Sequence, residues 1–336
     1  MRLLTCTLGL RYGLVALLAA LITLGCPRSK GGSWKLIHYE NLSHAAALER
    51  IIFDEKENGW VLTWAELSRV SDHGKTWTPV LTNQNGQRTF YSFVFTSPTT
   101  GVVVGTQKKP DGYNILILQT SDGGKKWEER SADVKGETDR DKSPALQSIA
   151  FCDGKNGWAV GEHLILHTND GGLTWLTQPA KLTGERLFTV ACVNSERAWV
   201  AGSGGLLLQT NDGGNTWTRQ ETGTKGVLMQ VRFFGANGWI VGGTNGLPVL
   251  LRTHNGGDSW QPQPLDVKVE LFDIYFIGND GWIAGQDGTI LQTNDGGKTW
   301  LRQTTATAED ITSLFFLSPD IGWAGGNRMT LLRFSK

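Results

Sequence analysis

One short pattern recurs along this chain at nearly even spacing. It reads Asp-x-Gly-x-x-Trp, with Asn once in place of Asp, and its tryptophans stand 40 to 50 residues apart. We call each copy a box. The six boxes begin at Asp72, Asp122, Asp170, Asp212, Asn255 and Asp295. A fixed period of this size predicts an array of similar structural units in which neighbours bury a shared core.

A second marker, which we call the tag, precedes each box by about 15–25 residues. It is Gly-Trp or Ala-Trp in six copies and the apolar pair Gly101-Val102 in a seventh. The tag tryptophans are Trp60, Trp158, Trp199, Trp239, Trp282 and Trp323. The chain therefore has seven tags but six complete boxes, so one repeat is missing its box.

The missing box lies at the other end of the chain. Gly31-Gly32-Ser33-Trp34 has the form of a box tail, and Trp34 stands 43 residues before Trp77. The C-terminus ends just after Leu331–Phe334, where a box would otherwise follow. The last repeat is thus split between the two termini. A closed ring needs such a split, because it ties the ends together and removes the sheet edges.

Each repeat predicts four strands. In the third repeat, Leu146–Phe151 alternates with period two, 158–161 is a short apolar run, 164–168 is the third strand and 174–177 begins the fourth. No segment of 33–336 carries a helical period. We therefore predict an all-β fold, a seven-bladed β-propeller of four-stranded antiparallel blades, with the N-terminal strand completing the C-terminal blade.

The box has a mechanical explanation. An Asp that opens a tight turn accepts backbone N–H groups two or three residues further on. The glycines supply positive φ, and the tryptophan buries a large apolar surface between sheets. We therefore interpret the six Asp and Asn residues as structural, and we expect them to form equivalent turns.

These residues carry a family resemblance. The boxes at Asp122, Asp170, Asp212 and Asp295 resemble Asp-boxes, also called bacterial neuraminidase repeats. Their combination with the Gly-Trp tag over nearly the whole chain is similar to the photosystem II stability/assembly factor family. The resemblance implies a seven-bladed propeller, exported to the thylakoid lumen or periplasm, whose photosynthetic members are chaperones for a reaction-centre membrane subunit. Those members use clustered arginines, and this chain has no Arg-Arg pair, so a relative in a non-photosynthetic bacterium fits equally well.

The N-terminus predicts export. Arg2 and Arg11 accompany an apolar run, 13–25, that is too short to span a membrane. Thr23-Leu24-Gly25-Cys26 resembles a bacterial lipoprotein processing site, in which the cysteine is acylated after cleavage. We predict a signal peptide over 1–25, a lipid on Cys26, a linker over 26–32 and one propeller over 33–336. A plain secretory signal or an uncleaved anchor is the alternative.

Two cysteines, Cys152 and Cys192, fall on the first strands of neighbouring repeats. They stand six and seven residues before their tag tryptophans. A disulfide needs Cα atoms less than about 7 Å apart. From this offset we expect two buried free thiols.

Strand direction predicts where a partner binds. The boxes and first turns of all blades fall on one face, and the variable second turns and blade links on the other. Variable loops on a rigid scaffold are where binding usually occurs. The candidate partner-binding residues on that face are Trp64, Lys108, Lys109, Tyr113 and Arg186. The alternative is that these loops are only solvated linkers, and the charged run 130–143 has that character.

Other functions find less support. Formal net charge is zero, so we expect no nucleic-acid partner, which would require a basic stripe. We also expect no metal and no cofactor, and a monomer. An Asp-box glycoside hydrolase of the sialidase type, or a carbohydrate-binding propeller, is the alternative. Its carboxylates would be Glu162, Asp287 and Asp111, but the sialidase Arg-x-Pro element is absent from the sequence.

Overall fold

The structure, a computed structural model, describes residues 32–37, 46–110, 112–133 and 145–336. Residues Gly32–Lys336 form one compact unit. The predicted signal peptide 1–25, Cys26 and all of the linker 26–32 except Gly32 lie outside the described residues. No helix in the described part of the chain is long and apolar enough to cross a membrane.

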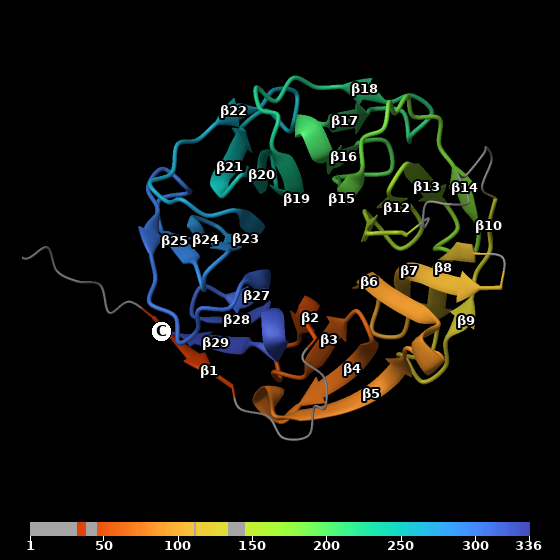
Figure 1. The fold of residues 1–336 in the computed structure, drawn as a ribbon, viewed down its shortest axis with the longest axis horizontal. Coiled ribbons are helices and arrows are strands. Elements are labelled where there is room, and N and C mark those ends of the chain that lie inside the picture. The colour runs from red at the N-terminus through yellow and green to blue at the C-terminus, as the bar shows by residue number, and fades with distance from the viewer. Residues whose placement is uncertain (1–31, 38–45, 111, 134–144) are drawn as a thin grey trace, which may run out of the picture. The chain divides into compact units, whose positions relative to one another are not determined.

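The described residues form seven sheets around a common axis (Figure 1). We number these blades in chain order. Blade 1 contains β2 (Leu48–Phe53), β3 (Gly59–Thr63), β4 (Glu66–Ser71) and β5 (Thr76–Thr82); blade 2 contains β6 (Arg88–Phe95), β7 (Gly101–Lys109), β8 (Gly112–Thr120) and β9 (Glu128–Glu129). Blade 3 contains β11 (Ser148–Phe151), β12 (Gly157–Gly161), β13 (Leu164–Thr168) and β14 (Trp175–Thr177); blade 4 contains β15 (Leu187–Cys192), β16 (Ala198–Gly202), β17 (Leu207–Thr210) and β18 (Thr218–Arg219).

The remaining blades follow the same order. Blade 5 contains β19 (Val227–Phe234), β20 (Asn237–Thr244), β21 (Leu247–Thr253) and β22 (Gln261–Pro262); blade 6 contains β23 (Leu271–Ile277), β24 (Asp280–Gly285), β25 (Ile290–Thr293) and β26 (Leu301–Arg302). Blade 7 contains β27 (Ile311–Ser318), β28 (Ile321–Gly326), β29 (Leu331–Ser335) and β1 (Ser33–Leu36). Short 3₁₀ turns occupy Asp72–Gly74, Gln84–Gly86, Ser203–Gly205 and Asn327–Met329.

The seven-bladed propeller predicted from the repeats is confirmed, with one addition. A fifth strand, β10 (Ala132–Asp133), pairs in parallel with the outer strand β14 of blade 3. It belongs to the charged run 130–143, for which a solvated linker is one of the two interpretations given above. The Thr177 hydroxyl donates a hydrogen bond to the Asp133 carbonyl at 2.9 Å. The start of this link therefore covers the exposed edge of the next blade.

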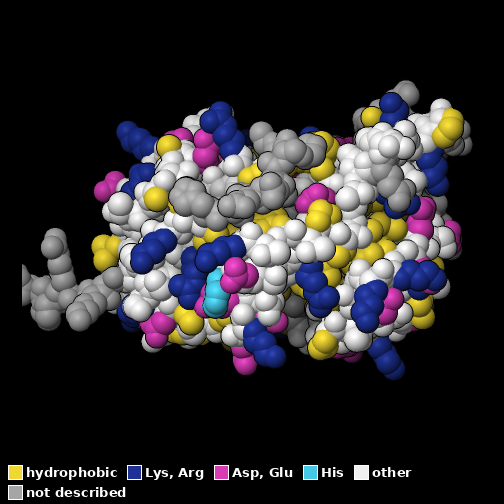
Figure 2. Space-filling view, turned by 90° about the horizontal axis from the view of Figure 1, so that it is seen from below, with side chains coloured by type: hydrophobic (Ala, Val, Ile, Leu, Met, Phe, Trp, Pro, Cys, Tyr) yellow, Lys and Arg dark blue, Asp and Glu magenta, His cyan; other side chains and the backbone are white. Residues whose placement is uncertain are grey.

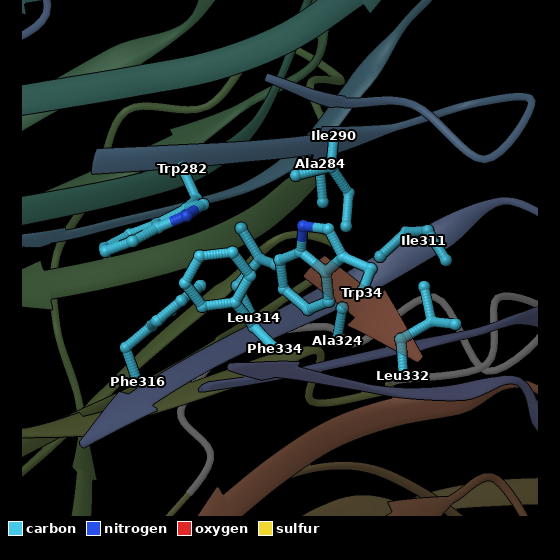
Figure 3. Close-up of a cluster of buried hydrophobic side chains, with 10 residues drawn as sticks. All are labelled: Trp34, Trp282, Ala284, Ile290, Ile311, Leu314, Phe316, Ala324, Leu332 and Phe334. Carbon is cyan, nitrogen blue, oxygen red and sulfur yellow. The ribbon is translucent and has the colours of Figure 1, made fainter. Parts of the chain in front are cut away.

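The split last blade is confirmed. β1 pairs antiparallel with β29, and Trp34 lies opposite Phe334. The Trp34 side chain is 6% exposed and packs with Phe316 and Phe334, at ring-centroid distances of 5.9 and 5.1 Å. Figure 3 shows its ring among side chains of β25, β27 and β29. The N-terminal strand thus closes the ring with both backbone pairing and a buried anchor.

Neighbouring blades are joined by one recurring aromatic contact. The tag tryptophan of a blade packs its ring against the phenylalanine near the end of the next blade's inner strand. Ring centroids are 4.7 Å apart for Trp60 and Phe95, 4.2 Å for Trp199 and Phe233, 5.1 Å for Trp239 and Phe276, 3.6 Å for Trp282 and Phe316, and 4.2 Å for Trp323 and Phe53. These pairs explain why the tag is so regular along the chain.

The inner strands carry a belt of polar contacts. A bulge follows the first buried residue of six of them, as at Leu48 and Arg50 in β2. In four blades a polar side chain of the inner strand accepts the backbone N–H of the next blade's inner strand; three of these side chains follow a bulge, and Ser148 of β11 has no bulge before it. The accepting side chains and donors are Ser148 and Val190 (3.4 Å), Thr189 and Val231 (3.4 Å), Asp273 and Leu314 (2.8 Å), and Ser313 and Ile51 (3.3 Å). An inner strand has no sheet neighbour on this side, so these bonds satisfy otherwise unpaired donors.

The expectation of free thiols is wrong. Cys152 and Cys192 form a disulfide with Cα atoms 5.5 Å apart, and it joins the inner-strand ends of blades 3 and 4. Cys192 takes the place that the phenylalanine of these pairs occupies in most blades, and Cys152 follows the equivalent Phe151. The offset between the two cysteines is only one residue, or about 3.3 Å of strand. Two cysteine side chains can span this distance. The expectation of free thiols was wrong because it took a one-residue offset as enough to keep the sulfur atoms apart.

The box hydrogen bonds expected from the sequence are present in five turns. At Asp170, Oδ1 accepts the N–H groups of Leu173 and Thr174 at 3.0 Å each, and the Thr168 hydroxyl donates to the same oxygen at 2.8 Å. That hydroxyl also accepts the Gly172 N–H at 2.9 Å. Corresponding bonds occur at Asp122, Asp212, Asn255 and Asp295.

The turn at Asp72 differs, so the expectation of six equivalent turns is wrong there. Val70 stands where the other boxes have threonine, and it cannot bond either the glycine N–H or the carboxylate. Asp72 and His73 adopt positive φ values of 51° and 57°. Within the described residues, the Asp72 carboxylate accepts no hydrogen bond from the turn. The missing hydroxyl thus changes the conformation of the whole turn.

We predict that Trp34→Ala destabilises the ring by roughly 3–5 kcal/mol, because it empties a buried aromatic site that joins the two termini. Urea unfolding followed by circular dichroism measures the change. Trp64→Ala is the matched control, since Trp64 is 41% exposed and its loss should cost less than about 0.5 kcal/mol. Equal effects of the two substitutions would contradict the closing role of Trp34.

The Asp170 turn predicts a pH dependence. Burial raises the pKa of Asp170, but hydrogen bonds from Thr174, Thr168 and Leu173 outweigh it and lower the pKa to about 2. A carboxyl with a lowered folded pKa stabilises the protein above its unfolded value, about 3.9, and loses that stabilisation as pH falls toward 2.

We therefore expect Asp170→Ala to cost roughly 1–2 kcal/mol at pH 7, and the gap to wild type to narrow between pH 4 and pH 2. Asp170→Asn should cost less at pH 7, because Asn255 forms the same turn in blade 5. Urea unfolding across this pH range tests both. A gap that stays constant with pH would show that the carboxylate charge contributes nothing.

Candidate partner-binding face

Hydrogen bonds between turns divide the loops into two faces. On the box face, the Gly123 N–H bonds the Thr99 carbonyl at 2.8 Å, so each box sits beside the first turn of its own blade. On the other, which we call the loop face, second turns bond to blade links. There the Asn83 N–H bonds the Ala65 carbonyl at 2.7 Å, and the Gly205 N–H bonds the Gly226 carbonyl at 2.8 Å. The two classes of loop predicted from strand direction are therefore on separate faces.

Two aromatic side chains protrude from the loop face. Trp64 is 41% exposed in the β3–β4 turn, and Tyr113 is 46% exposed near the start of β8. The Trp64 turn is rigid, because the Thr63 hydroxyl accepts the N–H groups of Ala65 and Glu66 at 3.2 and 3.0 Å. Trp64 thus combines an exposed apolar ring with a fixed backbone, which is the combination found in protein hot spots.

Lys108 and Lys109 lie at the end of β7, and both side chains are exposed. The Lys109 ammonium lies 3.9 Å from the Glu129 carboxylate, which also meets Arg88 at 3.4 Å. The Lys108 N–H bonds the Gln87 carbonyl in the adjoining link. The lysines and Tyr113 therefore share one hairpin of blade 2, and Trp64 is in the neighbouring blade.

Arg186 lies further round the ring, in the link between blades 3 and 4. It is ion-paired with Glu162 at 2.7 Å and passes 5.8 Å from the Phe188 ring centre. The structure thus brings Trp64, Lys108, Lys109 and Tyr113 into two adjacent blades and leaves Arg186 outside that group. Most of the variable run 130–143, together with Asp111, lies outside the described residues.

Tyr91 and Glu49 are two further side chains on this side of the molecule, and we did not single them out from the sequence. Tyr91 is close enough to Tyr113 and Arg186 to interact electrostatically with both. Both follow the first buried residue of an inner strand and are partly exposed. Burial, with smaller contributions from nearby Glu49 and Glu162, raises the pKa of Tyr91, while the Arg186 charge lowers it. Burial raises the pKa of Glu49 to about 7. A polar residue at the bulge of an inner strand is the sequence signal that would have found them.

Charges on the surface are mixed. In the view of Figure 2, lysine and arginine side chains alternate with acidic ones, without a continuous field of either sign. Glu162 and Asp287, two of the carboxylates that the glycosidase alternative would use, belong to turns of blades 3 and 6. His167 is packed against the Trp158 ring, and burial lowers its pKa. Among the described residues, no three His, Cys, Asp or Glu side chains are grouped to hold a metal ion.

Comparison with solved structures finds several similar chains. "YCF48 from Cyanidioschyzon merolae" is 20% identical, with a TM-score of 0.65 over 90% of this chain and 98% of that one. "YCF48 bound to D1 peptide" is 22% identical, with a TM-score of 0.47 over 74% and 93%. The GH74 enzyme of Niastella koreensis is 11% identical, with a TM-score of 0.69 over 87% and 53%. The likenesses with TM-scores of 0.65 and 0.69 show the fold alone.

Sequence comparison identifies the family. No curated protein sequence matches the chain. The family described as "Photosynthesis system II assembly factor YCF48" matches residues 83–186, 137–225, 182–271, 221–307 and 268–335. Together these overlapping matches cover blades 2 to 6 and the chain's last three strands. The resemblance found from boxes and tags is therefore confirmed, and the chain belongs to the photosystem II assembly factor YCF48 family.

Proposed function

We propose that this chain is an exported, lipid-anchored and non-enzymatic propeller that binds a polypeptide subunit of a membrane complex and acts as its scaffold or chaperone. The observation that carries the proposal is the group Trp64, Lys108, Lys109 and Tyr113, which exposes two aromatic rings and two cations on adjacent blades. The family description, an assembly factor, supports the same role.

The chemistry of this group favours a polypeptide. Exposed aromatic rings bury large apolar area at little entropic cost, and cations beside them select acidic or carbonyl-rich segments. The ring holds the loops in fixed positions, so little ordering is needed on binding. A partner that crosses these two blades toward the axis would also meet Tyr91.

We expect the triple variant Trp64→Ala, Lys108→Ala, Lys109→Ala to reduce partner capture from solubilised membranes at least about tenfold. The full chain serves as bait, and captured subunits are quantified by mass spectrometry. Lys125→Ala with Lys126→Ala is the matched control, because it removes two exposed lysines from the box face. Unchanged capture by a folded triple variant would rule out this group as the binding site.

The lipid anchor has its own test. We expect Cys26→Ser to abolish incorporation of labelled fatty acid and to release the chain from the membrane fraction when it is expressed in a bacterium. The thioether-linked lipid supplies most of the membrane affinity, since a single acyl chain already gives measurable binding and two give stable anchoring. Cys6→Ser is the control. Retention of the label in Cys26→Ser would exclude acylation at Cys26.

A further inference from the structure

A cavity opens between blades 1 and 2 on the box face, opposite the loops discussed above. Its volume is about 590 Å³, and its walls come from β2–β5 and from the end of β6 with the turn after it. Trp60 and Phe95 supply aromatic surface, Asn58 and Ser97 supply polar groups, and Arg69 is its one cationic side chain. This space is large enough for a small organic molecule or a terminal residue of a peptide.

The cavity exposes part of Trp60, whereas the tag tryptophans of the other blades are buried. Trp60 is partly exposed, whereas the other five tag tryptophans are at most 1% exposed. Its ring is stacked on Phe95, with centroids 4.7 Å apart, and the Arg69 guanidinium lies 5.3 Å from its centre. Stacking on an aromatic face holds a guanidinium in place and leaves its N–H donors free at the edge.

Arg69 has an internal counterpart whose partner is known. Arg69 lies opposite Trp60 in the β3–β4 pair, and Arg333 lies opposite Trp323 in the β28–β29 pair. Arg333 also packs against its tryptophan, at 5.9 Å. Its Nε and an Nη donate to the two carboxylate oxygens of Glu57 at 2.8 and 2.7 Å. Arg333 thus shows that an arginine at this position can hold a carboxylate through paired donors.

The corresponding carboxylate is missing beside Arg69. Glu57 belongs to the first turn of blade 1, which follows blade 7 around the ring. In this turn the Asp54 N–H donates a hydrogen bond to the Asn58 carbonyl at 2.7 Å. In the first turn of blade 2 the Thr96 N–H donates the equivalent hydrogen bond to the Thr100 carbonyl at 3.0 Å. Thr99, the residue before Thr100, therefore occupies the position that Glu57 has before Asn58. Within the described residues, the Arg69 guanidinium has no ion-pair partner. The cavity occupies the space beside it.

We propose that this cavity binds a carboxylate that carries an apolar group. Arg69 receives the carboxylate as Arg333 receives Glu57, through paired N–H donors. The apolar group lies against the exposed edge of Trp60 and against Phe95. Asp54 is the one acidic side chain in the walls, and its Oδ1 already accepts the N–H groups of Lys56 and Asn58 at 2.9 and 3.0 Å.

The ligand has two possible sources with the same chemistry, a free organic acid and the C-terminal residue of a polypeptide. Both present a planar carboxylate beside an apolar side chain. The site is on the opposite face from Trp64 and the lysines, so it does not depend on the proposed partner-binding group. A result at one face leaves the other unaffected.

Titration calorimetry on the full chain tests the proposal with 3-phenylpropanoate and 3-phenylpropanol as probes. The acid should bind at least about tenfold more tightly than the alcohol, because the alcohol cannot accept the paired charged donors. A tetrapeptide ending in Phe with a free carboxylate, compared with its C-terminal amide, distinguishes the polypeptide source from the small acid. Equal binding of acid and alcohol, and of peptide and amide, would overturn the proposal.

Variants locate the site. Arg69→Gln should weaken acid binding at least about tenfold, and Arg69→Lys should recover only part of the loss, because lysine lacks the planar fork. Arg252→Gln is the matched control, since Arg252 stacks on Trp239 at 4.5 Å but does not line the cavity.

Thr78→Trp provides a second route that keeps Arg69. Thr78 is an exposed wall residue on a strand, where an aromatic side chain is tolerated. Filling the cavity from this side should also abolish binding, with the melting temperature checked by circular dichroism. Undiminished binding in a folded Thr78→Trp or Arg69→Gln variant would place the acid elsewhere.

Discussion

The pairing of the first described strand with the last is the contact on which the rest of this structure depends. Six of the seven blades are continuous in sequence, and the seventh has its fourth strand only when β1 joins β29. Without that strand, blade 7 would expose an unpaired edge, and the ring would have two free ends. The buried Trp34 ring adds apolar contact to the four backbone pairs. Closure thus fixes the positions of both faces at once.

Closing the ring creates a second problem, which the polar belt resolves. Each inner strand faces the axis and has no sheet partner there. Serine, threonine and aspartate side chains from one blade accept the free N–H groups of the next. At Asp273 the arrangement includes a charge, because Arg232 donates two hydrogen bonds to it at 3.0 and 2.9 Å. The belt links blades near the axis, while the tryptophan–phenylalanine contacts link them further out.

The repeats in the sequence predicted the blades and their order, but neither the polar belt nor the features in which one blade differs from the others. The number of blades, the order of their strands and the split last blade follow from the tags and boxes, because each copy marks the same position in a blade. The disulfide was missed because a phenylalanine position held a cysteine in one blade only. The different turn at Asp72 follows from a single absent hydroxyl at Val70. The arginine beside the cavity has no ion-pair partner among the described residues, because Thr99 stands where blade 1 has Glu57. This difference becomes visible only when the two turns are compared in space.

The Cys152–Cys192 disulfide adds a covalent cross-link between side chains to the contact of blades 3 and 4. It encloses residues 153–191, which include β12 to β14 and most of β15. A break of the backbone anywhere in that loop would leave both pieces attached to each other. The ring can therefore tolerate a proteolytic cut there without losing a fragment, provided that its surroundings keep the sulfur atoms oxidised. Among the described residues, the two pieces left by a backbone cut outside this loop would be held together by non-covalent contacts alone.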